Sequence, residues 1–454
     1  MVHKKYIYFL GIGGIGMSAL ARYFHAQGYV VAGYDKTPSP LTIKLQEEGI
    51  KVSFVDDAVD LPQEYTEYKN ETLVVYTPAI PKDSLLFNFF KDSAYNLSKR
   101  AEVLGVVTRQ TLNLSVAGTH GKTTTSCIVA TILQHSDKKF SAFLGGISTN
   151  LNSNYYHQKG EGEHYSVTEA DEFDRSFLQL SPDYTVITST DADHLDIYGK
   201  KEEIEASYLE FSQRLKDTTH IFKAYGTLET IAGVTYSASD MNADYYAVIT
   251  SKNGQGTHFS IANNVGREVI ADVYLNIPGL HNLENAIGAA LMCMKAGVSI
   301  ASIREGLAQF KGIKRRFENV LNNEKVTYID DYAHHPSELR AIISSVRELY
   351  PKKKITAVFQ PHLFTRTQDF MNEFAYELSQ LDELLLIPIY PAREKPIAGV
   401  TSEAVLERMT LSNARCVAKE EVLHELKKSK VQVLLTLGAG DIDRLVPQIK
   451  EYYA

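Results

Sequence analysis

Residues 115–127, SVAGTHGKTTTSC, have the composition of a phosphate-binding loop that runs into a helix. Lys122 offers a positive charge to the terminal phosphates of a nucleotide, Thr123 offers a hydroxyl to Mg²⁺, and the amides of residues 119–124 offer an anion-binding nest. In the usual loop, Gly-x-x-x-x-Gly-Lys, a glycine stands where this chain has Val116. The shortened loop keeps the other parts and predicts an ATP site made by Gly118, Thr119, His120, Gly121, Lys122, Thr123 and Thr124.

Acidic residues follow each of the next two apolar strands, YSVTEAD and YTVITSTDAD. These residues are Glu169, Asp171 and Glu172 in the first group, and Asp191, Asp193 and Asp196, together with His194, in the second. Carboxylates at the carboxyl ends of parallel strands face the crevice where ligands bind. Since Mg²⁺ prefers oxygen ligands and keeps waters, we expect Thr123 and Glu169 to bind it directly and His194 to bind it directly or through water. A polar loop with a capping aspartate is the alternative for the second group.

A second glycine loop, GIGGIG at 11–16, lies between an expected strand and an expected helix. Its glycines are Gly11, Gly13, Gly14 and Gly16, and Asp35 ends the next strand. This spacing lets backbone amides and a helix N-terminus approach a pyrophosphate. NAD, FAD and nucleotide sugars all contain that group, and a tight turn without a ligand has the same glycines.

Two further motifs, DDYAHHP at 330–336 and QPHLFTRT at 360–367, each follow an expected strand. We expect their side chains to gather at the carboxyl ends of adjacent strands. Arg366 suits a carboxylate and the neighbouring acids suit an ammonium group, so the rim predicts a small zwitterionic ligand. The third glycine loop, LGAGD at 437–441, is interpreted as a tight turn.

These motifs require parallel sheets, and the chain has the alternation of apolar runs and amphipathic stretches that builds them. Its 454 residues allow about three domains. We predict an α/β protein with a Rossmann-like domain at 1–108, a P-loop-type domain with a mostly parallel sheet at 109–313, and a second Rossmann-like domain at 314–454. Short strand-like pieces from 218 to 276 predict an antiparallel insertion in the central domain.

Composition excludes several classes of protein. The formal net charge of -8 gives no basic face for nucleic acid. No run reaches the roughly eighteen apolar residues of a membrane span, and the glycines after Leu10 disfavour a signal peptide. The 3 cysteines are scattered, which suits a reducing compartment. We therefore expect a cytoplasmic protein without nucleic-acid or membrane partners.

Taken together, the motifs resemble those of the Mur ligase family over residues 6–441. They are GIGGIGMS, AGTHGKTTT, EADEFDRSFL, DADHLDIYG, GLHNLENA, KRRFE, DDYAHHPSE and FQPHLFTRT, in that order. The resemblance implies that the first domain binds a UDP-sugar through Gly11, Gly13, Gly14, Gly16 and Asp35. It also implies that the second domain binds ATP and Mg²⁺ and that the third domain closes over both.

Within the family, the chain is similar to members that join L-alanine to the lactyl carboxylate of UDP-N-acetylmuramate through an acyl phosphate, in peptidoglycan precursor synthesis. The resemblance implies ATP and Mg²⁺ as cofactors, with two magnesium ions and Mn²⁺ as a substitute. It implies catalytic roles for Lys122, Glu169, His194 and Arg316, and further ATP contacts from Asn282, Asn285, Arg316 and Asp331. It assigns the alanine and the muramoyl carboxylate to Tyr332, His334, His362 and Arg366.

Two departures from the family pattern stand out. Leu363 occupies a position where many members have a basic residue, and EASYLEF at 205–211 has no lysine to bridge two metals. Three other functions are weighed: a recycling ligase that attaches a tripeptide to the same sugar nucleotide, a nicotinamide-dependent dehydrogenase and a nucleotide-binding switch. The dehydrogenase would leave the Lys122 loop and both acidic groups without a role. Monomer and homodimer both stay open.

Overall fold

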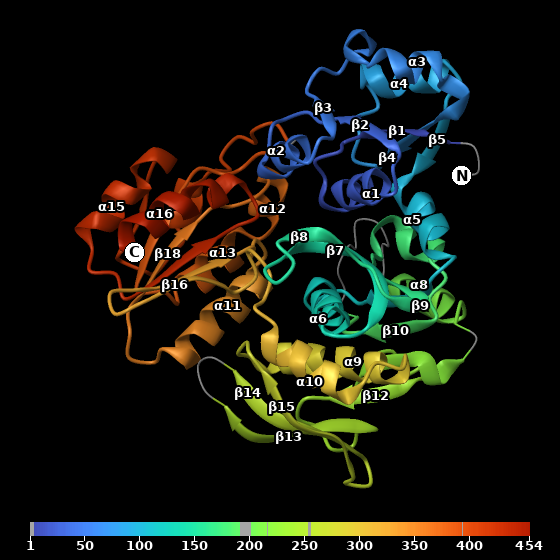
Figure 1. Ribbon diagram of the computed structural model, residues 1–454. Coiled ribbons are helices and arrows are strands. Elements are labelled where there is room, and N and C mark those ends of the chain that lie inside the picture. Colours follow the sequence, from blue (N-terminus) through green and yellow to red (C-terminus); the bar gives the residue numbers. More distant parts are fainter. Residues whose placement is uncertain (1–3, 191–200, 216, 253–255, 393) are drawn as a thin grey trace. The chain divides into compact units, whose positions relative to one another are not determined.

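The computed structural model describes residues 4–190, 201–215, 217–252, 256–392 and 394–454. The chain divides into two compact units, residues 1–311 and residues 312–454 (Figure 1). In the described residues, three sheets of five, ten and six strands carry the fold, and the helices lie between consecutive strands. This arrangement confirms the predicted α/β class.

The first sheet has the strand order β3-β2-β1-β4-β5, and its paired strands are parallel. The strand order reverses beside β1, and the Gly11–Gly16 loop leaves the sheet there, where ligands bind in such folds. The elements are β1 Tyr6–Leu10, α1 Ile15–Ala26, β2 Val30–Tyr34, α2 Pro40–Glu47, β3 Lys51–Ser53, α3 Gln63–Glu67, β4 Thr72–Tyr76, α4 Leu85–Asp92, β5 Asn96–Lys99 and α5 Arg100–Thr108.

The second sheet has the order β15-β14-β13-β12-β11-β10-β6-β9-β7-β8. Strands β9 and β10 lie on either side of β6, so the acidic group at the end of β9 lies beside the loop that follows β6. The elements are β6 Leu112–Ala117, α6 Lys122–Gln134, β7 Lys138–Ser148, β8 Ser153–Gln158, β9 Glu161–Ala170, β10 Tyr184–Ile187, α8 Lys201–Ser212, β11 Ile221–Ala224, β12 Val234–Ser237, β13 Tyr245–Lys252, β14 Thr257–Asn263, β15 Glu268–Leu275, α9 Leu280–Lys295 and α10 Ile300–Gln309.

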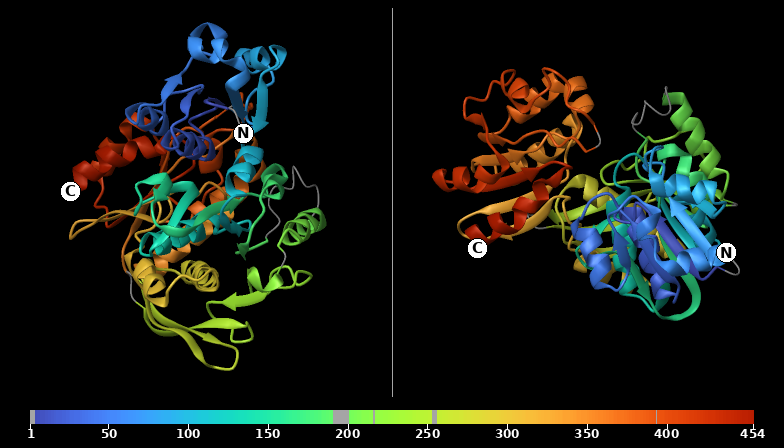
Figure 2. Two further views of the ribbon diagram at one scale, coloured as in Figure 1. Left: turned by 45° about the vertical axis from the view of Figure 1, so that its right-hand side comes forward. Right: turned by 90° about the horizontal axis from the view of Figure 1, so that it is seen from above.

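The antiparallel insertion is shorter than the sequence predicts. Strands β11 and β12 continue the parallel sheet, and the pairing becomes antiparallel only from β13 through β15. The sequence argument was wrong for residues 221–237 because short strands between glycines look alike in either direction. Helices α9 and α10 pack against α6, and β15 packs against α10 (Figures 1 and 2). The insertion therefore lies away from the Lys122 loop.

The hairpin of β7 and β8 links the second sheet to helix α1 of the first. Asn154, at the start of β8, is fully buried, and its amide donates to Ile15 O at 2.5 Å and to Ser18 Oγ at 2.9 Å. Its carbonyl oxygen accepts from the guanidinium of Arg22, which also pairs with Glu48 at 2.6 Å. Apolar residues of both sheets share one buried cluster. The two sheets of residues 1–311 are thus held together by a hydrophobic core and a polar joint.

The third sheet, in residues 312–454, has the order β16-β17-β21-β18-β19-β20, and only β16 pairs antiparallel among its described strands. Two buried clusters cover its faces. The elements are β16 Glu318–Asn322, β17 Thr327–Asp331, α11 Pro336–Leu349, β18 Ile355–Phe359, α12 Phe364–Asp369, α13 Met371–Leu378, β19 Glu383–Leu386, α14 Ser402–Leu406, β20 Ala414–Cys416, α15 Val422–Lys428, β21 Val433–Leu437 and α16 Val446–Tyr453.

Among the residues that the structure describes, no helix has the length and apolar character needed to cross a membrane.

The polar joint at Asn154 generates a stability prediction. Asn154→Ala removes three hydrogen bonds to α1, one of them from the charged Arg22, so we expect the free energy of unfolding of the full chain to fall by about 3 kcal/mol. Urea unfolding followed by circular dichroism measures it. Asn264→Ala, at an exposed position after β14, is the control and should change stability by less than about 0.5 kcal/mol. Equal losses of stability in Asn154→Ala and Asn264→Ala would contradict the role of Asn154 in joining the two sheets.

Candidate active site

The phosphate-loop segment connects β6 to α6 through a turn that glycine makes possible. Gly118 has φ +129°, and a Cβ there would lie 2.2 Å from Thr188 Oγ1 at the end of β10. The loop therefore packs directly on the neighbouring strand. Helix α6 begins at Lys122, with Gly121 as its N-cap. Lys122 and Thr123 thus occupy the first turn, where the helix dipole favours an anion.

The anion-binding nest contains fewer available backbone amides than the sequence predicts. The amide of Thr119 donates to Ser189 O at 3.0 Å, and the amide of His120 donates to Ser189 Oγ at 2.8 Å. These two donors hold the loop on β10, and only the amides of residues 121–124 have the geometry of unpaired helix N–H groups. Ser189 was not selected from the sequence, because no motif marks a serine whose role is to bind loop amides.

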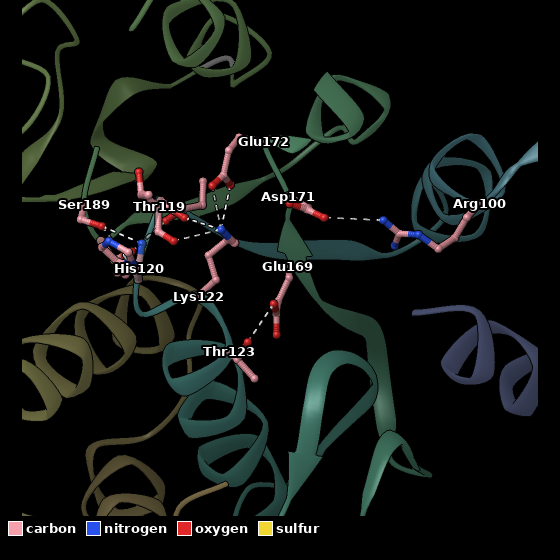
Figure 3. A network of polar contacts seen from close by, with 12 residues as sticks. Arg100, Thr119, His120, Lys122, Thr123, Glu169, Asp171, Glu172 and Ser189 are labelled. Carbon is pink, nitrogen blue, oxygen red and sulfur yellow. Dashed lines mark hydrogen bonds and ion pairs between the residues drawn. The ribbon is translucent and has the colours of Figure 1, made fainter. Parts of the chain in front are cut away.

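The ammonium group of Lys122 is held by two kinds of oxygen. Nζ donates to Gly118 O at 2.7 Å, and it lies 3.0 Å and 2.8 Å from the two carboxylate oxygens of Glu172. The Glu172 side chain is 3% exposed and the Lys122 side chain 15%. Burial raises the pKa of Glu172, and the nearby Lys122 opposes that shift. The pair forms a buried salt bridge at the start of α6 (Figure 3).

Thr123 points instead toward Glu169, the carboxylate predicted to bind metal (Figure 3). Its Oγ1 donates to Glu169 Oε2 at 3.1 Å, and Ser126 Oγ donates to Glu169 Oε1 at 3.0 Å. The amide of Gly145 donates to the same carboxylate at 2.6 Å, and a Cβ at Gly145 would lie 2.3 Å from it. A hydroxyl beside a carboxylate is an oxygen donor set that fits Mg²⁺.

The remaining predicted metal ligand, His194, lies outside the described residues, as do Asp191, Asp193 and Asp196. Within the described ranges, no group of three His, Cys, Asp or Glu side chains is placed to hold a metal ion. The described part of the predicted magnesium site is therefore the pair Thr123 and Glu169.

The two predicted adenine contacts, Asn282 and Asn285, both lie on α9. Asn285 approaches the loop closely, since a Cβ on Gly121 would lie 2.6 Å from Asn285 Oδ1. Asn282 donates to Pro278 O at 2.7 Å, which fixes the start of its own helix. Both side chains are largely buried. Asn285 is thus brought to the phosphate loop, whereas the Asn282 amide has a bond within its own segment.

The GIGGIG loop runs from the end of β1 into the first turn of α1. Asp35 accepts from the Gly13 amide at 2.8 Å, which ties the loop to the end of β2. The guanidinium of Arg100, from the start of α5, lies near Gly16, since a Cβ there would be 2.9 Å from Nη1. Arg100 also lies 3.9 Å from Asp171. Arg100 was not selected from the sequence, because the motif marks glycines and the cation comes from a distant helix.

In residues 312–454, the linker arginines have different environments. The Arg315 guanidinium lies over the Tyr332 ring, 4.9 Å from the ring centre. Arg315 also forms ion pairs with Asp443 at 3.4 Å and with Asp330 at 3.8 Å. Its Nη2 donates to Gly440 O at 3.2 Å in the LGAGD loop. Arg316, predicted to contact phosphates, is exposed. Arg315 thus fixes the linker to its own domain, and Arg316 points into solvent.

Asp331, predicted to bind ribose, holds backbone at the end of β17. It accepts from the Phe317 amide at 2.6 Å and from the Ala333 amide at 2.8 Å, and burial raises its pKa to about 6. Its neighbour Asp330 is 2% exposed, accepts from Thr436 Oγ1 and has a pKa raised to about 7, also by burial.

The four predicted substrate residues of this domain do gather. The rings of Tyr332 and His334 are 5.2 Å apart, and those of His334 and His362 are 5.8 Å apart. Arg366 Nη1 lies 3.4 Å from His362 Nδ1. Burial lowers the pKa of both histidines. The pKa of His362 falls to about 4, and the nearby His334 and Arg366 add to that shift. The rim therefore presents neutral imidazoles beside an arginine at neutral pH.

The strands that carry this rim are not adjacent, which corrects the sequence argument. β21 lies between β17 and β18, and it inserts the LGAGD loop between the two motifs. Gln360 holds that loop, donating to Asp441 Oδ1 at 2.9 Å and accepting from the Ile442 amide at 3.0 Å. His335 caps α11 rather than joining the rim. Strand order was not predictable here, because the last strand of the chain enters the middle of the sheet.

Models of three Mur ligase domains match this chain. They are the Mur ligase family catalytic domain at residues 6–111, the Mur ligase middle domain at 116–293 and the Mur ligase glutamate ligase domain at 315–441. The chain belongs to the Mur ligase family. The family resemblance stated from the motifs is confirmed.

The chain is similar over its whole length to Mur ligases called UDP-N-acetylmuramate–L-alanine ligase. The protein of that name from Flavobacterium psychrophilum is 48% identical, with 98% of this chain and 97% of that protein covered. The one from Porphyromonas gingivalis strain ATCC 33277 is 46% identical, with 99% of each covered.

Solved Mur ligase structures share the fold. A UDP-N-acetylmuramate–alanine ligase from Thermotoga maritima superposes with a TM-score of 0.82 at 28% identity, covering 98% of both chains. A murein peptide ligase from Psychrobacter arcticus superposes with a TM-score of 0.72 at 21% identity over the same share. The predicted three-domain architecture is confirmed by the first match; the exact domain limits stay a prediction.

The buried Asp330 of this Mur ligase generates a pH prediction. Its folded-state pKa of about 7 lies above the value of an unfolded aspartate, so its contribution to stability is complete below about pH 4 and is lost as the pH rises through 7. That loss is at most about 4 kcal/mol. We expect Asp330→Asn to lose less melting temperature between pH 5 and pH 8 than the wild type.

Thermal melting of the full chain at a series of pH values measures the difference. Asp369→Asn, at an exposed position in the same unit, is the control and should follow the wild-type profile. A profile of Asp330→Asn that runs parallel to the wild type would show that Asp330 is ionised in the folded state throughout this range.

Proposed function

We propose that this chain is an ATP-dependent ligase that forms an amide between the amine of L-alanine and the lactyl carboxylate of UDP-N-acetylmuramate, as a step of peptidoglycan precursor synthesis. ATP becomes ADP and phosphate in the reaction. The observation that carries the proposal is the start of α6, where Lys122 and Thr123 stand beside Glu172 and Glu169. It occurs in a chain with close relatives of that activity over its full length.

The reaction divides into two transfers. A carboxylate is a poor electrophile, so a lactyl carboxylate oxygen first attacks the γ-phosphorus of ATP. The bond from that phosphorus to the β-phosphate oxygen breaks, and ADP leaves. The neutral amine of alanine then attacks the carbonyl carbon of the acyl phosphate, phosphate leaves, and the amide nitrogen loses its extra proton. Both partners of the first step are anions, so the site has to supply positive charge.

The start of α6 supplies that charge from this chain's own groups. The amides of residues 121–124 and the Lys122 ammonium would bind the phosphates. Thr123 and Glu169 would hold Mg²⁺, and His194 is the proposed ligand of a second ion. When bound, Mg²⁺ would offset the negative charge on the phosphates, and Mn²⁺ is the proposed substitute. Asn285 would contact the adenine and the GIGGIG loop the UDP.

The rim in residues 312–454 suits the other reactants. His334 Nδ1 donates to Tyr332 O at 2.9 Å, because a carbonyl oxygen only accepts, so its Nε2 is left as an acceptor when the ring is neutral. Such an acceptor can orient an alanine amine that must be neutral to attack. Arg366 is the proposed partner of a carboxylate, and exposed Arg316 is the proposed partner of phosphate. Closure of this domain over the acyl phosphate would exclude water.

We propose a cytoplasmic location, where ATP and sugar nucleotides are available, and leave monomer and homodimer as the candidate states.

Phosphate release tests the proposed function. We expect release to require UDP-N-acetylmuramate and L-alanine together. Lys122→Ala should lower kcat/KM at least about 100-fold, because it removes the charge that faces the phosphates. Lys295→Ala, an exposed lysine at the end of α9, should keep the wild-type rate. Release with a tripeptide but not with alanine would assign the chain to the recycling reaction instead.

Glu169 generates a separate prediction on magnesium. Glu169→Gln keeps the size of the side chain but removes the charge, so we expect the Mg²⁺ concentration for half-maximal rate to rise at least about tenfold. Magnesium titration of the phosphate-release rate measures it. Glu163→Gln changes an exposed glutamate of the same strand and should leave the titration unchanged. Equal midpoints in the two variants would remove Glu169 from the metal site.

A further inference from the structure

The proposed mechanism gives Glu172 no chemical role, although both of its carboxylate oxygens contact the loop lysine. Glu172 follows β9, and its carboxylate takes the Lys122 ammonium with both oxygens, at 3.0 Å and 2.8 Å. Gly118 O takes a further bond at 2.7 Å, and Thr119 O lies 3.4 Å from Nζ. The three protons of the ammonium are therefore directed at protein oxygens in this structure.

Burial makes this pair difficult to separate. The Glu172 side chain is 3% exposed, so with Lys122 in place bulk water contributes little to stabilising its charge. A buried carboxylate that loses its cation is destabilised, and Glu172 would stand beside the incoming phosphates, which carry the same sign of charge. Both charges are compensated if Lys122 contacts Glu172 and a phosphate at the same time.

The geometry allows Lys122 to do so. Two ammonium protons face the same carboxylate, so one of them can turn to a phosphate while the other keeps Glu172. The bond to Gly118 O holds the third ammonium proton. Glu169, by contrast, contacts Thr123 and Ser126, so the two glutamates of the motif act on different groups of α6.

We propose that Glu172 is a positioning residue that holds the Lys122 ammonium in place through nucleotide binding and phosphoryl transfer, and that it lowers ATP affinity in doing so. This inference rests on the proposed function, since it assumes that ATP binds at the start of α6. Glu172 keeps the lysine aimed at the transferred phosphoryl group, where its charge is needed, and its own negative charge weakens the binding of ATP.

The test separates binding from rate. Glu172→Gln keeps the shape but not the charge. We expect its Kd for ATP with Mg²⁺, measured by calorimetry on the full chain, to fall about three- to tenfold, and its kcat for phosphate release to fall at least about tenfold. A side chain with only a structural role would weaken both together.

Asp171→Asn is the matched comparison. It removes one unit of charge from the adjacent residue, whose side chain is 41% exposed and lies 3.9 Å from Arg100. We expect the Kd for ATP of Glu172→Gln to be at least about threefold lower than that of Asp171→Asn. Weaker ATP binding in Glu172→Gln, or equal values in the two variants, would overturn the inference.

A stability cycle covers the case in which Glu172→Gln folds poorly. Lys122→Met removes the cation that faces the buried Glu172 carboxylate, so the melting temperature of this variant should fall, and adding Glu172→Gln to it should restore part of the loss. If the losses of melting temperature of the two single variants simply add in the double variant, the proposed coupling between Lys122 and Glu172 is wrong. If the wild type itself binds no ATP, the proposed function fails; if the wild type binds ATP and Glu172→Gln behaves like it, only the role of Glu172 fails.

Discussion

The start of α6 carries two neighbouring side chains that are each matched to a separate carboxylate. Lys122 faces Glu172, and Thr123 faces Glu169, so one helical turn presents an ammonium group and a hydroxyl side by side. Glu169 lies in β9, which pairs with β6 in parallel register, and Glu172 lies two residues beyond the end of that strand. The sheet therefore sets the position of Glu169, and the short connection after β9 brings Glu172 to Lys122.

The same strand end connects this site to the domain that carries the GIGGIG loop. Glu169 holds the Gly145 amide of β7, and the hairpin that β7 forms with β8 inserts Asn154 beside the first turn of α1. That turn begins at the GIGGIG loop. A sugar nucleotide on one loop and ATP on the other would therefore lie on elements joined by buried hydrogen bonds, as a reaction between their bound ligands requires.

Much of this was predictable from the sequence. Apolar strands that end in glycine or acidic residues predicted the positions of both glycine loops and of Glu169, because these motifs are local in the sequence. Pairing across the fold was not predictable: the Glu172 partner of Lys122, the Asn154 joint and the insertion of β21 between β17 and β18 depend on strand order. The two linker arginines are adjacent and chemically identical, so only the fold distinguishes half-buried Arg315 from exposed Arg316.

A crystal structure of the full chain with a non-hydrolysable ATP analogue and Mg²⁺ tests the central claim most directly. We expect the phosphates at the start of α6, with the magnesium ion bound by Thr123 and Glu169 and the Lys122 ammonium shared between a phosphate and Glu172. A nucleotide bound at the GIGGIG loop, or a magnesium ion without either of those two ligands, would contradict the account.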